Sequence, residues 1–289
     1  MNEHKPVLIE EVAAFFADMK MACFCDGTLG LGGHARRILE EHPEIEEFFG
    51  IDRDDAALSI AKEVLSPFDC KLHLIHGDYV DLPRHLQSRR PDGIFLDLGV
   101  SSLQLDQPER GFSFRHDAPL DMRMDRRSPM TAAKAIMELG QKELEEVFKE
   151  YGEEPRWRQA AKAVVEARRK KPVKTTLELR AVLLPVLRKG GRIDPLTRVF
   201  QALRIYVNSE LEVLQKGLLR AISCLPKDGL LGVIAFHSLE DRIVKNTFRE
   251  CAKEGKILLL TKKPKVPTRE EIRHNRRARS AKMRFAKKI

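Results

Sequence analysis

Glycines and acidic residues in the first hundred positions have the spacing of a site for a nucleoside cofactor. The segment DGTLGLGGHA, residues 26–35, leaves an apolar run and enters a helical pattern. Its glycines let the backbone approach a ligand closely, and free amides at a helix start favour an anionic group. A second apolar run ends at Asp52, 25 positions after Gly27, where a carboxylate can accept hydrogen bonds from both ribose hydroxyls. The pattern therefore indicates a nucleoside cofactor.

This strand–turn–helix arrangement suits either NAD or S-adenosylmethionine (SAM). The loop does not read G-x-G-x-x-G from its first glycine, and Asp26 suits the ammonium group of SAM better than a pyrophosphate. SAM is therefore favoured over NAD. His34, at the start of the following helix, is expected either beside the ligand or as a helix cap. Tyr79, after the third apolar run, is expected to cover an adenine or to pack in the core.

A fourth apolar run, GIFLD, ends at Asp97, and ligands of open α/β sheets bind outside the carboxyl ends of the strands. Methyl transfer to an exocyclic amine is a reaction that such an acid suits, because the lone pair of the amine is delocalised into its base. A hydrogen-bond acceptor at the N–H would favour attack and take up developing positive charge. The alternatives for Asp97 are a cofactor contact or a cap for the next turn.

Another apolar run, LLGVIAF, is followed by His237. This histidine is expected either at the same crevice, as a substrate contact or general base, or as a buried histidine with its hydrogen bonds satisfied. Ser238 and Asp241 resemble a capping box, so Ser238 is predicted to cap the next helix. A Ser–His–Asp hydrolase is not supported, because the sequence has no G-x-S-x-G segment.

Aromatic and basic residues alternate in the segment ERGFSFRHDAPLDMRMDRR, residues 109–127. Phe112 and Phe114 could stack on bases, and Arg115 and Arg123 could hold phosphates, so this segment is predicted to bind the substrate. The alternative is a structured loop closed by Arg–Asp pairs.

Positive charge is concentrated near the carboxyl terminus. The chain has 52 Lys and Arg against 43 Asp and Glu, a net charge of +9. Residues 256–289 contain 13 basic residues and two Glu, a net charge of +11, so the remaining residues sum to −2. This asymmetry indicates a polyanionic partner such as a nucleic acid, although charge runs are also common on solvated faces. The segment RRARSAKMRFAKK is expected to be mobile in isolation.

The elements that must position these residues follow from the apolar patterns. Runs at 21–25, 46–51, 71–76 and 93–98 alternate with helical patterns, which predicts an α/β fold with a mostly parallel sheet and helices on both faces. A loop over 103–129 precedes helical stretches, the last predicted as one helix over 199–225. A strand follows at 230–236, a helix from 238 and a last strand at 256–261. We therefore predict a core of residues 1–102 and 206–289, interrupted by a mainly helical substrate-recognition insert at 103–205.

Several classes of protein are disfavoured. No apolar run approaches the roughly 18 residues of a membrane span, and the polar start MNEHKPVLIEEV lacks the features of a leader peptide, so a cytoplasmic protein is expected. The five cysteines include no C-x-x-C pair, which argues against a zinc ribbon, and we expect no metal.

Long segments of the chain resemble the MraW (RsmH) family of bacterial SAM-dependent rRNA methyltransferases. The similar segments include HKPVLIEEV, DGTLGLGGHA, GIDRD, GIFLDLGVSSLQLDQPERGFSFRHDAPLDMRMD, RVFQALRIYVNSEL and GVIAFHSLEDRIVK, and the resemblance runs from about residue 4 to about residue 285. It implies a class I methyltransferase core with an inserted helical domain. It also implies N4-methylation of one cytidine of 16S rRNA in the decoding centre, near the P site, on the assembled small ribosomal subunit. No obligate protein partner is implied.

Carried over motif by motif, the resemblance places contacts to SAM on seven residues: Gly32, Gly33, His34, Asp52, Tyr79, Asp97 and Gln104. The family more often has Phe at the position of Tyr79 and SSPQLD in place of SSLQLD. The chain also lacks the D-P-P-Y tetrad of many amino-methyltransferases, so Asp97 as the catalytic acceptor is our own hypothesis. The alternatives are a SAM-binding ribosome-assembly or RNA-binding factor without methyl transfer, and a DNA amino-methyltransferase.

Overall fold

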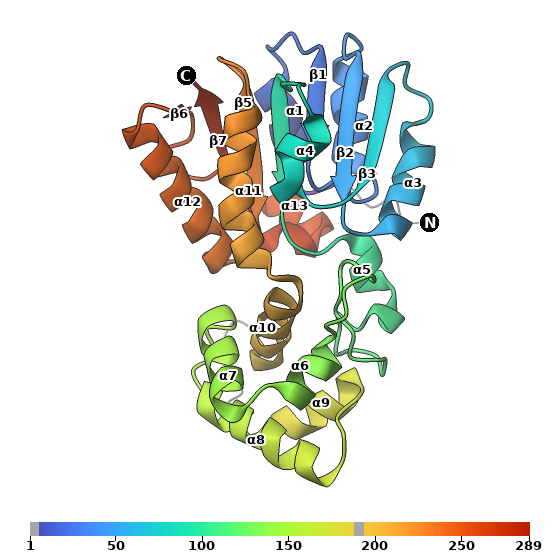
Figure 1. Cartoon of the computed structure of the whole chain (residues 1–289), viewed down its shortest axis with the longest axis vertical. Helices are drawn as coiled ribbons and strands as arrows, with labels where there is room; N and C mark the ends of the chain where they lie inside the picture. Colours follow the sequence, from blue (N-terminus) through green and yellow to red (C-terminus); the bar gives the residue numbers. More distant parts are fainter. Residues whose placement is uncertain (1–5, 188–193) are drawn as a thin grey trace. The chain divides into compact units, whose positions relative to one another are not determined.

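The computed structural model describes residues 6–187 and 194–289 (Figure 1). The chain divides into two compact units, the first formed by Met1–Gly99 with Leu211–Ile289 and the second by Val100–Glu210. The second unit begins three residues before the predicted insert and ends five residues after it, since the insert was expected at 103–205. Each unit has a hydrophobic core of its own.

The described residues of the first unit form a seven-stranded sheet with the order β3-β2-β1-β4-β5-β7-β6. Its strands are β1 (Cys23–Asp26), β2 (Glu47–Asp52), β3 (Lys71–His76), β4 (Gly93–Asp97), β5 (Leu230–Ala235), β6 (Ile257–Leu259) and β7 (Lys282–Lys288). The first five strands are parallel, and β7 runs antiparallel to both β5 and β6. The predicted α/β class with a mostly parallel sheet is therefore confirmed.

Helices pack on both faces of this sheet, because strands buried on two sides need an apolar cover on each. The helices are α1 (Ile9–Phe16), α2 (Gly33–Glu41), α3 (Asp55–Leu65), α4 (Leu82–Leu86), α11 (Glu210–Cys224), α12 (Ser238–Lys253) and α13 (Arg269–His274). One core joins α1, α2 and α3 to Phe24 and Phe48 of the sheet, and another joins α4, α11 and α12 to Ile94 and Leu231. Figure 1 shows α4 and α11 in front of the strands and α1 behind them.

The carboxyl-terminal segment is more ordered than its charge suggests. We expected residues 276–288 to be mobile, but Arg276–Ser280 form a 3₁₀ helix and Lys282–Lys288 form β7 inside the sheet. Met283 and Phe285 alternate toward the core, and the ring of Phe15 stacks on Phe285 with centroids 3.3 Å apart. On the other face, Arg284 Nε donates to Asp241 Oδ1 at 2.7 Å. The prediction was wrong because the charge obscured a period-two apolar pattern.

The prediction of a single helix over 199–225 was also wrong. The chain instead forms α10 (Pro195–Asn208) and then α11, separated at Ser209. Ser209 adopts the left-handed conformation, with φ +50°, which ends α10 and redirects the chain. Beside this break, Arg204 donates to both carboxylate oxygens of Glu210 at 2.8 Å.

The described part of the second unit is mainly helical. Its helices are α5 (Ser102–Asp106), α6 (Ala132–Glu138), α7 (Gln141–Glu146), α8 (Trp157–Lys170), α9 (Thr176–Leu183) and α10, with a 3₁₀ turn at Pro108–Arg110 and a π-helical turn at Val147–Tyr151. Phe148, Val164 and Leu203 lie at the centre of its core. The Pro/Asp/Arg-rich loop between α5 and α6 packs against this core through Leu120 and Met122.

Candidate functional site

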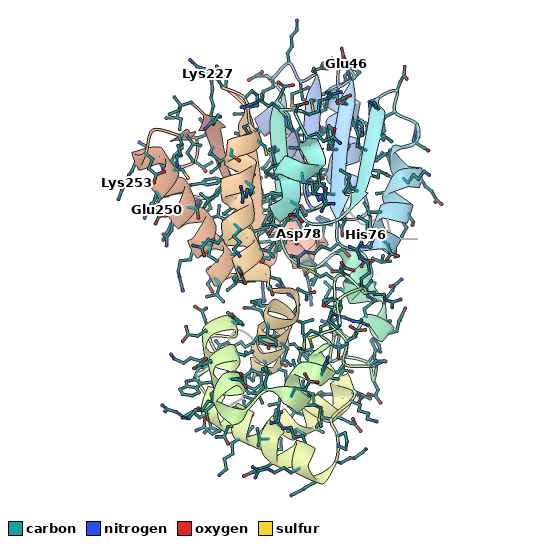
Figure 2. The ribbon with its side chains drawn as sticks, viewed as in Figure 1. Glu46, His76, Asp78, Lys227, Glu250 and Lys253 are labelled. Atoms are coloured by element: carbon teal, nitrogen blue, oxygen red, sulfur yellow. The ribbon has the colours of Figure 1, made fainter. Side chains whose placement is uncertain are left out.

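Three acidic residues come together where β1, β2 and β4 end. Asp26 and Asp97 are the last residues of β1 and β4, and Asp52 is the last residue of β2. The parallel register brings all three to one edge of the sheet, which we call the carboxyl edge. Figure 2 shows His76 and Asp78, where β3 ends, at the opposite end of the strands from Glu46, which precedes β2. Ligands of open α/β sheets bind at this edge.

Asp26 is the most buried of the three acids, with 2% of its surface exposed. Its Oδ1 accepts a hydrogen bond from the Thr28 amide at 3.0 Å. Burial raises the pKa of Asp26 to about 7, against the opposing effects of that amide and of His34; Asp97 and Asp52 raise it further. A carboxyl group in this state favours a cationic ligand group, which would stabilise its ionised form.

Asp52 is held in place by two backbone amides. Its Oδ2 accepts from Gly30 at 2.7 Å and its Oδ1 from Asp54 at 2.8 Å. Burial raises the pKa of Asp52 to about 6, although both amides lower it. Each carboxylate oxygen has two acceptor positions, so both oxygens can still accept from a ligand. This geometry suits a ribose with two neighbouring hydroxyls.

At the same edge, His34, which is buried, pairs with Asp97, which is half-buried. His34 Nε2 lies 3.5 Å from Asp97 Oδ2, and only 7% of His34 is exposed. The Asp97 amide donates to Thr28 Oγ1 at 2.5 Å, which fixes the backbone at the end of β4. Within residues 6–187 and 194–289, neither ring nitrogen of His34 nor Asp97 Oδ1 makes a hydrogen bond. Buried polar atoms normally have partners, so these three atoms are suited to hydrogen-bond a polar ligand.

The glycine-rich turn lies between these acids and packs tightly. Gly32 adopts φ +83°, a conformation that side chains disfavour, and it directly precedes α2. A Cβ on Gly33 would lie 2.5 Å from Pro6 Cγ, so a side chain there would displace the amino-terminal segment. The turn therefore needs glycine at both positions, and both belong to the predicted cofactor contacts.

Tyr79 follows β3 as predicted, but its ring is buried with 9% exposure in the core beside α11. Gly217 of α11 lies so close that a Cβ there would contact the Tyr79 ring. This is the packing role that the sequence left open, and a contact with adenine stays a prediction. The adjacent Asp78 pairs with Arg53 and accepts from the Val80 amide at 3.0 Å.

His237, not Ser238, caps α12, so the predicted cap was wrong. His237 Nδ1 accepts from the Glu240 amide at 3.4 Å, and Glu240 Oε2 accepts from the His237 amide at 3.3 Å. His237 Nε2 also lies 3.2 Å from Glu240 Oε1. The partner is Glu240 because it is the third residue of the helix and can reach back to the cap. A role for His237 toward the substrate stays a prediction.

Gln104 belongs to the second unit and forms a reciprocal cap with Ser101. Its side-chain Oε1 accepts from the Ser101 backbone amide at 3.1 Å, and the Gln104 backbone amide donates to Ser101 Oγ at 3.3 Å. The side chain is buried. These hydrogen bonds do not test the predicted contact of Gln104 with the cofactor, which stays a prediction.

Two of the four predicted substrate residues have internal roles in the second unit. Phe112 is only 8% exposed and belongs to the helical core, with the guanidinium of Arg110 5.9 Å from its ring centroid. Arg123 donates to both oxygens of Asp121, at 2.7 and 2.8 Å, which is the loop-closing pair that the sequence allowed. Phe114 is half-buried against Phe200, with centroids 5.1 Å apart, and Arg115 is exposed.

Sequence reasoning missed two residues of the carboxyl edge. Thr28 holds the Asp97 amide through its hydroxyl, and Pro6 covers Gly33. The only sequence signal for the role of Thr28 was its place in the DGT turn. No sequence signal pointed to Pro6, because its contact with Gly33 joins segments far apart in the sequence. Among the residues that the structure describes, no helix combines the length and apolarity needed to span a lipid bilayer.

Comparison with known proteins identifies the family. The model of the MraW methylase family matches residues 1–289. A protein of Persephonella marina named ribosomal RNA small subunit methyltransferase H is 48% identical over 100% of both chains. One of the same name from Chlamydia abortus is also 48% identical, over 99% of this chain and 98% of its own. Among solved structures, an rRNA methylase from Streptococcus thermophilus covers 100% of this chain and 99% of its own, at 9% identity and a TM-score of 0.47.

The family match confirms the methyltransferase predicted from the sequence. The donor set at the carboxyl edge also fits the predicted cofactor, because it offers acidic groups for a cationic amino acid and a ribose acceptor beside a glycine-rich turn. The chain belongs to the MraW methylase family, and its cofactor is S-adenosylmethionine.

Proposed function

We propose that this protein methylates the exocyclic N4 amine of one cytidine of 16S rRNA in the decoding centre, near the P site, on the small ribosomal subunit in the cytoplasm. The observation that carries the proposal is Asp97, a half-buried carboxylate whose buried Oδ1 makes no hydrogen bond within the described residues and which lies beside the acids of the proposed cofactor site. The names of the relatives support small-subunit rRNA as the substrate.

The cofactor would be held by groups that complement its charge and its hydroxyls. When bound, SAM supplies a methyl group on a sulfonium, which is electrophilic without further activation. Asp26 would bind the ammonium group, and Asp52 would accept from the ribose hydroxyls while its two backbone amides keep its carboxylate oriented. The turn at Gly32 and Gly33 would let the ligand approach the start of α2.

Asp97 would act on the amine of the cytosine. The nitrogen lone pair of this amine is delocalised into the ring, so the amine is a poor nucleophile. A carboxylate oxygen that accepts from its N–H favours the attacking geometry and stabilises the positive charge that develops on nitrogen. The N–C bond would form as the S–C bond to the methyl group breaks, with its electron pair left on sulfur, and Asp97 Oδ1 would take the proton that the nitrogen must lose. His34, 3.5 Å from Oδ2, would hold the carboxylate in this orientation.

The second unit would bind RNA around the target nucleotide. Phe114 and Arg115 are its best candidates among the predicted residues, because one ring is half-exposed and one guanidinium is exposed. A base stacked on an aromatic ring contributes about 1–3 kcal/mol to single-strand binding. Phe112 and Arg123 would instead support the loop from inside, through the core contact and the Asp121 pair described above.

The test is transfer of labelled methyl from SAM to small subunits that lack the modification, to naked 16S rRNA and to duplex DNA, followed by nucleoside mass spectrometry. We expect N4-methylcytidine in the subunits. Asp97→Asn should abolish it, whereas Asp228→Asn, at an exposed acid 63% accessible on the amino side of β5, should not. Subunit binding without transfer would favour an assembly factor, and methylated DNA would favour a DNA amino-methyltransferase.

A further inference from the structure

Unpaired cations are concentrated on the segment that connects β6 to β7. Residues 262–279 contain eight Lys or Arg and two Glu. Seven of these cations are exposed, and we call them the basic arm: Lys262, Lys263, Lys265, Arg269, Arg273, Arg276 and Arg279. None of the seven forms an ion pair within residues 6–187 and 194–289. Cations elsewhere on the first unit commonly form ion pairs, as Arg36 does with Glu40 and Arg89 with Glu47.

The backbone beneath the basic arm is ordered, so its charges are held in place. Thr268 Oγ1 accepts from the Glu271 amide at 3.1 Å at the start of α13. Glu271 Oε1 in turn accepts from the Leu8 amide at 2.7 Å, which ties α13 to the amino-terminal segment. Ala278 is buried in the core of the first unit. With Glu271 engaged inward, Glu270 is the exposed anion within the arm.

The basic arm lies near the carboxyl edge. One row of backbone partners crosses the sheet there, from Asp97 to Ile234 to Met283 and then to Lys265. Neighbouring strands are about 4.8 Å apart, so three steps place the Lys265 backbone roughly 14 Å from that of Asp97. The link through Leu8 also leads to Pro6, which covers Gly33 of the cofactor turn. Figure 1 shows α13 in the lower half of the strand-bearing unit, the half in which β3 ends.

We propose that the basic arm binds phosphates of the rRNA close to the target nucleotide, an inference that rests on the proposed function. Because the Lys265 backbone lies roughly 14 Å from that of Asp97, an RNA strand whose base reaches Asp97 would bring its neighbouring phosphates close to the arm. Exposed cations without protein partners are available for phosphate contacts, and such contacts position a nucleic acid without reading its sequence. Each contact releases counterions, so it contributes a defined increment to the salt dependence of binding.

The test measures the affinity for unmodified small subunits as a function of salt concentration. Arg273→Gln, Arg276→Gln and Arg279→Gln are combined in one variant. Lys262→Gln, Lys263→Gln and Lys265→Gln are combined in a second, so that the result does not depend on the folding of one variant. The matched control combines Lys62→Gln, Lys227→Gln and Lys253→Gln, which removes the same charge from exposed positions of the same unit. Figure 2 shows Lys227 at the opposite end of the sheet and Lys253 on α12.

We expect each arm variant to lower the slope of log K against log salt by about 2 to 3, since three lost contacts contribute about 0.7–0.9 each. The control should keep the wild-type slope, and all variants should keep the wild-type affinity for SAM. Equal slopes in the arm variants and the control would overturn the inference, as would weaker binding with an unchanged slope, because the partner would then not be phosphate. Methyl transfer by the wild-type protein is scored separately, so failure of the proposed function is distinguishable.

Discussion

Binding of SAM should become tighter as the pH rises from 6 to 7 if, as proposed, two acids of the carboxyl edge ionise to hold it. The pKa of Asp26 is about 7 and that of Asp52 about 6 in the ligand-free protein, both raised chiefly by burial. A cationic ammonium beside Asp26 and donor hydroxyls at Asp52 favour the ionised carboxylates. Binding therefore releases protons, and the protonated fraction of each acid weakens the apparent affinity.

The magnitude follows from the two pKa values. Between pH 6 and 7 the ionised fraction of an acid with a pKa of about 7 rises roughly 5.5-fold, and with a pKa of about 6 roughly 1.8-fold. Their product is about tenfold in Kd, or about 1.4 kcal/mol. The stability of the ligand-free fold depends on pH in the opposite direction, because it falls as the pH rises. Because both folded pKa values are above the unfolded value of 3.8, these acids favour the ligand-free folded state below about pH 4, and that stabilisation is lost as the pH rises through 6 and 7.

Isothermal titration calorimetry with SAM at pH 6.0, 6.5 and 7.0, in buffers of different ionisation enthalpy, measures both Kd and the protons released. The wild-type protein should release close to one and a half protons per SAM at pH 6 and show the tenfold change. Asp26→Asn should bind weakly and lose most of the pH dependence, whereas Asp228→Asn should behave as wild type. A Kd that is constant across this range, or an unchanged pH dependence in Asp26→Asn, would refute the assignment of these acids to the cofactor.

Three further substitutions test other parts of the structure. Asp97→Asn should lower kcat by about 100-fold or more in the methyl-transfer assay while the Kd for SAM changes less than tenfold, since the amide keeps an acceptor oxygen but loses the negative charge that would stabilise the developing positive charge; equal loss in both would make Asp97 a cofactor ligand only. Gly217→Ala should destabilise the protein by about 1–3 kcal/mol in urea unfolding, because its methyl group meets the Tyr79 ring, and unchanged stability would mean that the ring can move aside. Asp241→Ala should cost about 3 kcal/mol in the same assay by leaving Arg284 unpaired in β7; adding Arg284→Met should recover part of that loss, and no recovery would show that the pair is not the cause.

The carboxyl edge could be predicted from the sequence because its information is local. Three of the apolar runs lead into an acid at their carboxyl end, and parallel strands bring these ends together whatever the connecting segments do. Asp26, Asp52 and Asp97 therefore needed only the strand pattern to be placed. The Thr28 bond to the Asp97 amide and the Pro6 contact with Gly33 could not be predicted, because they depend on how distant segments pack.

Elements near the carboxyl terminus show where local patterns mislead. The sequence of β7 resembles a basic tail, because four of its seven residues are Lys or Arg and only Met283, Phe285 and Ala286 are apolar. Its pairing depends on Asp241, more than 40 residues earlier, which neutralises Arg284 within the sheet. The break at Ser209 was also hidden from the sequence, because no proline or glycine marks it and the helical periodicity continues on both sides.

The family match decides the choice between cofactors that the glycine-rich turn left open, and the acids of the carboxyl edge agree with it. A pyrophosphate would bring negative charge beside Asp26, whose pKa the carboxyl groups of Asp97 and Asp52 already help to raise. SAM instead carries a sulfonium and an ammonium, which would favour the ionised form of Asp26. The turn alone is compatible with either ligand, and we expect the selectivity for SAM to come from acids on three separate strands. The burial that raises the pKa values of Asp26 and Asp52 in the ligand-free protein would then also favour a cationic cofactor.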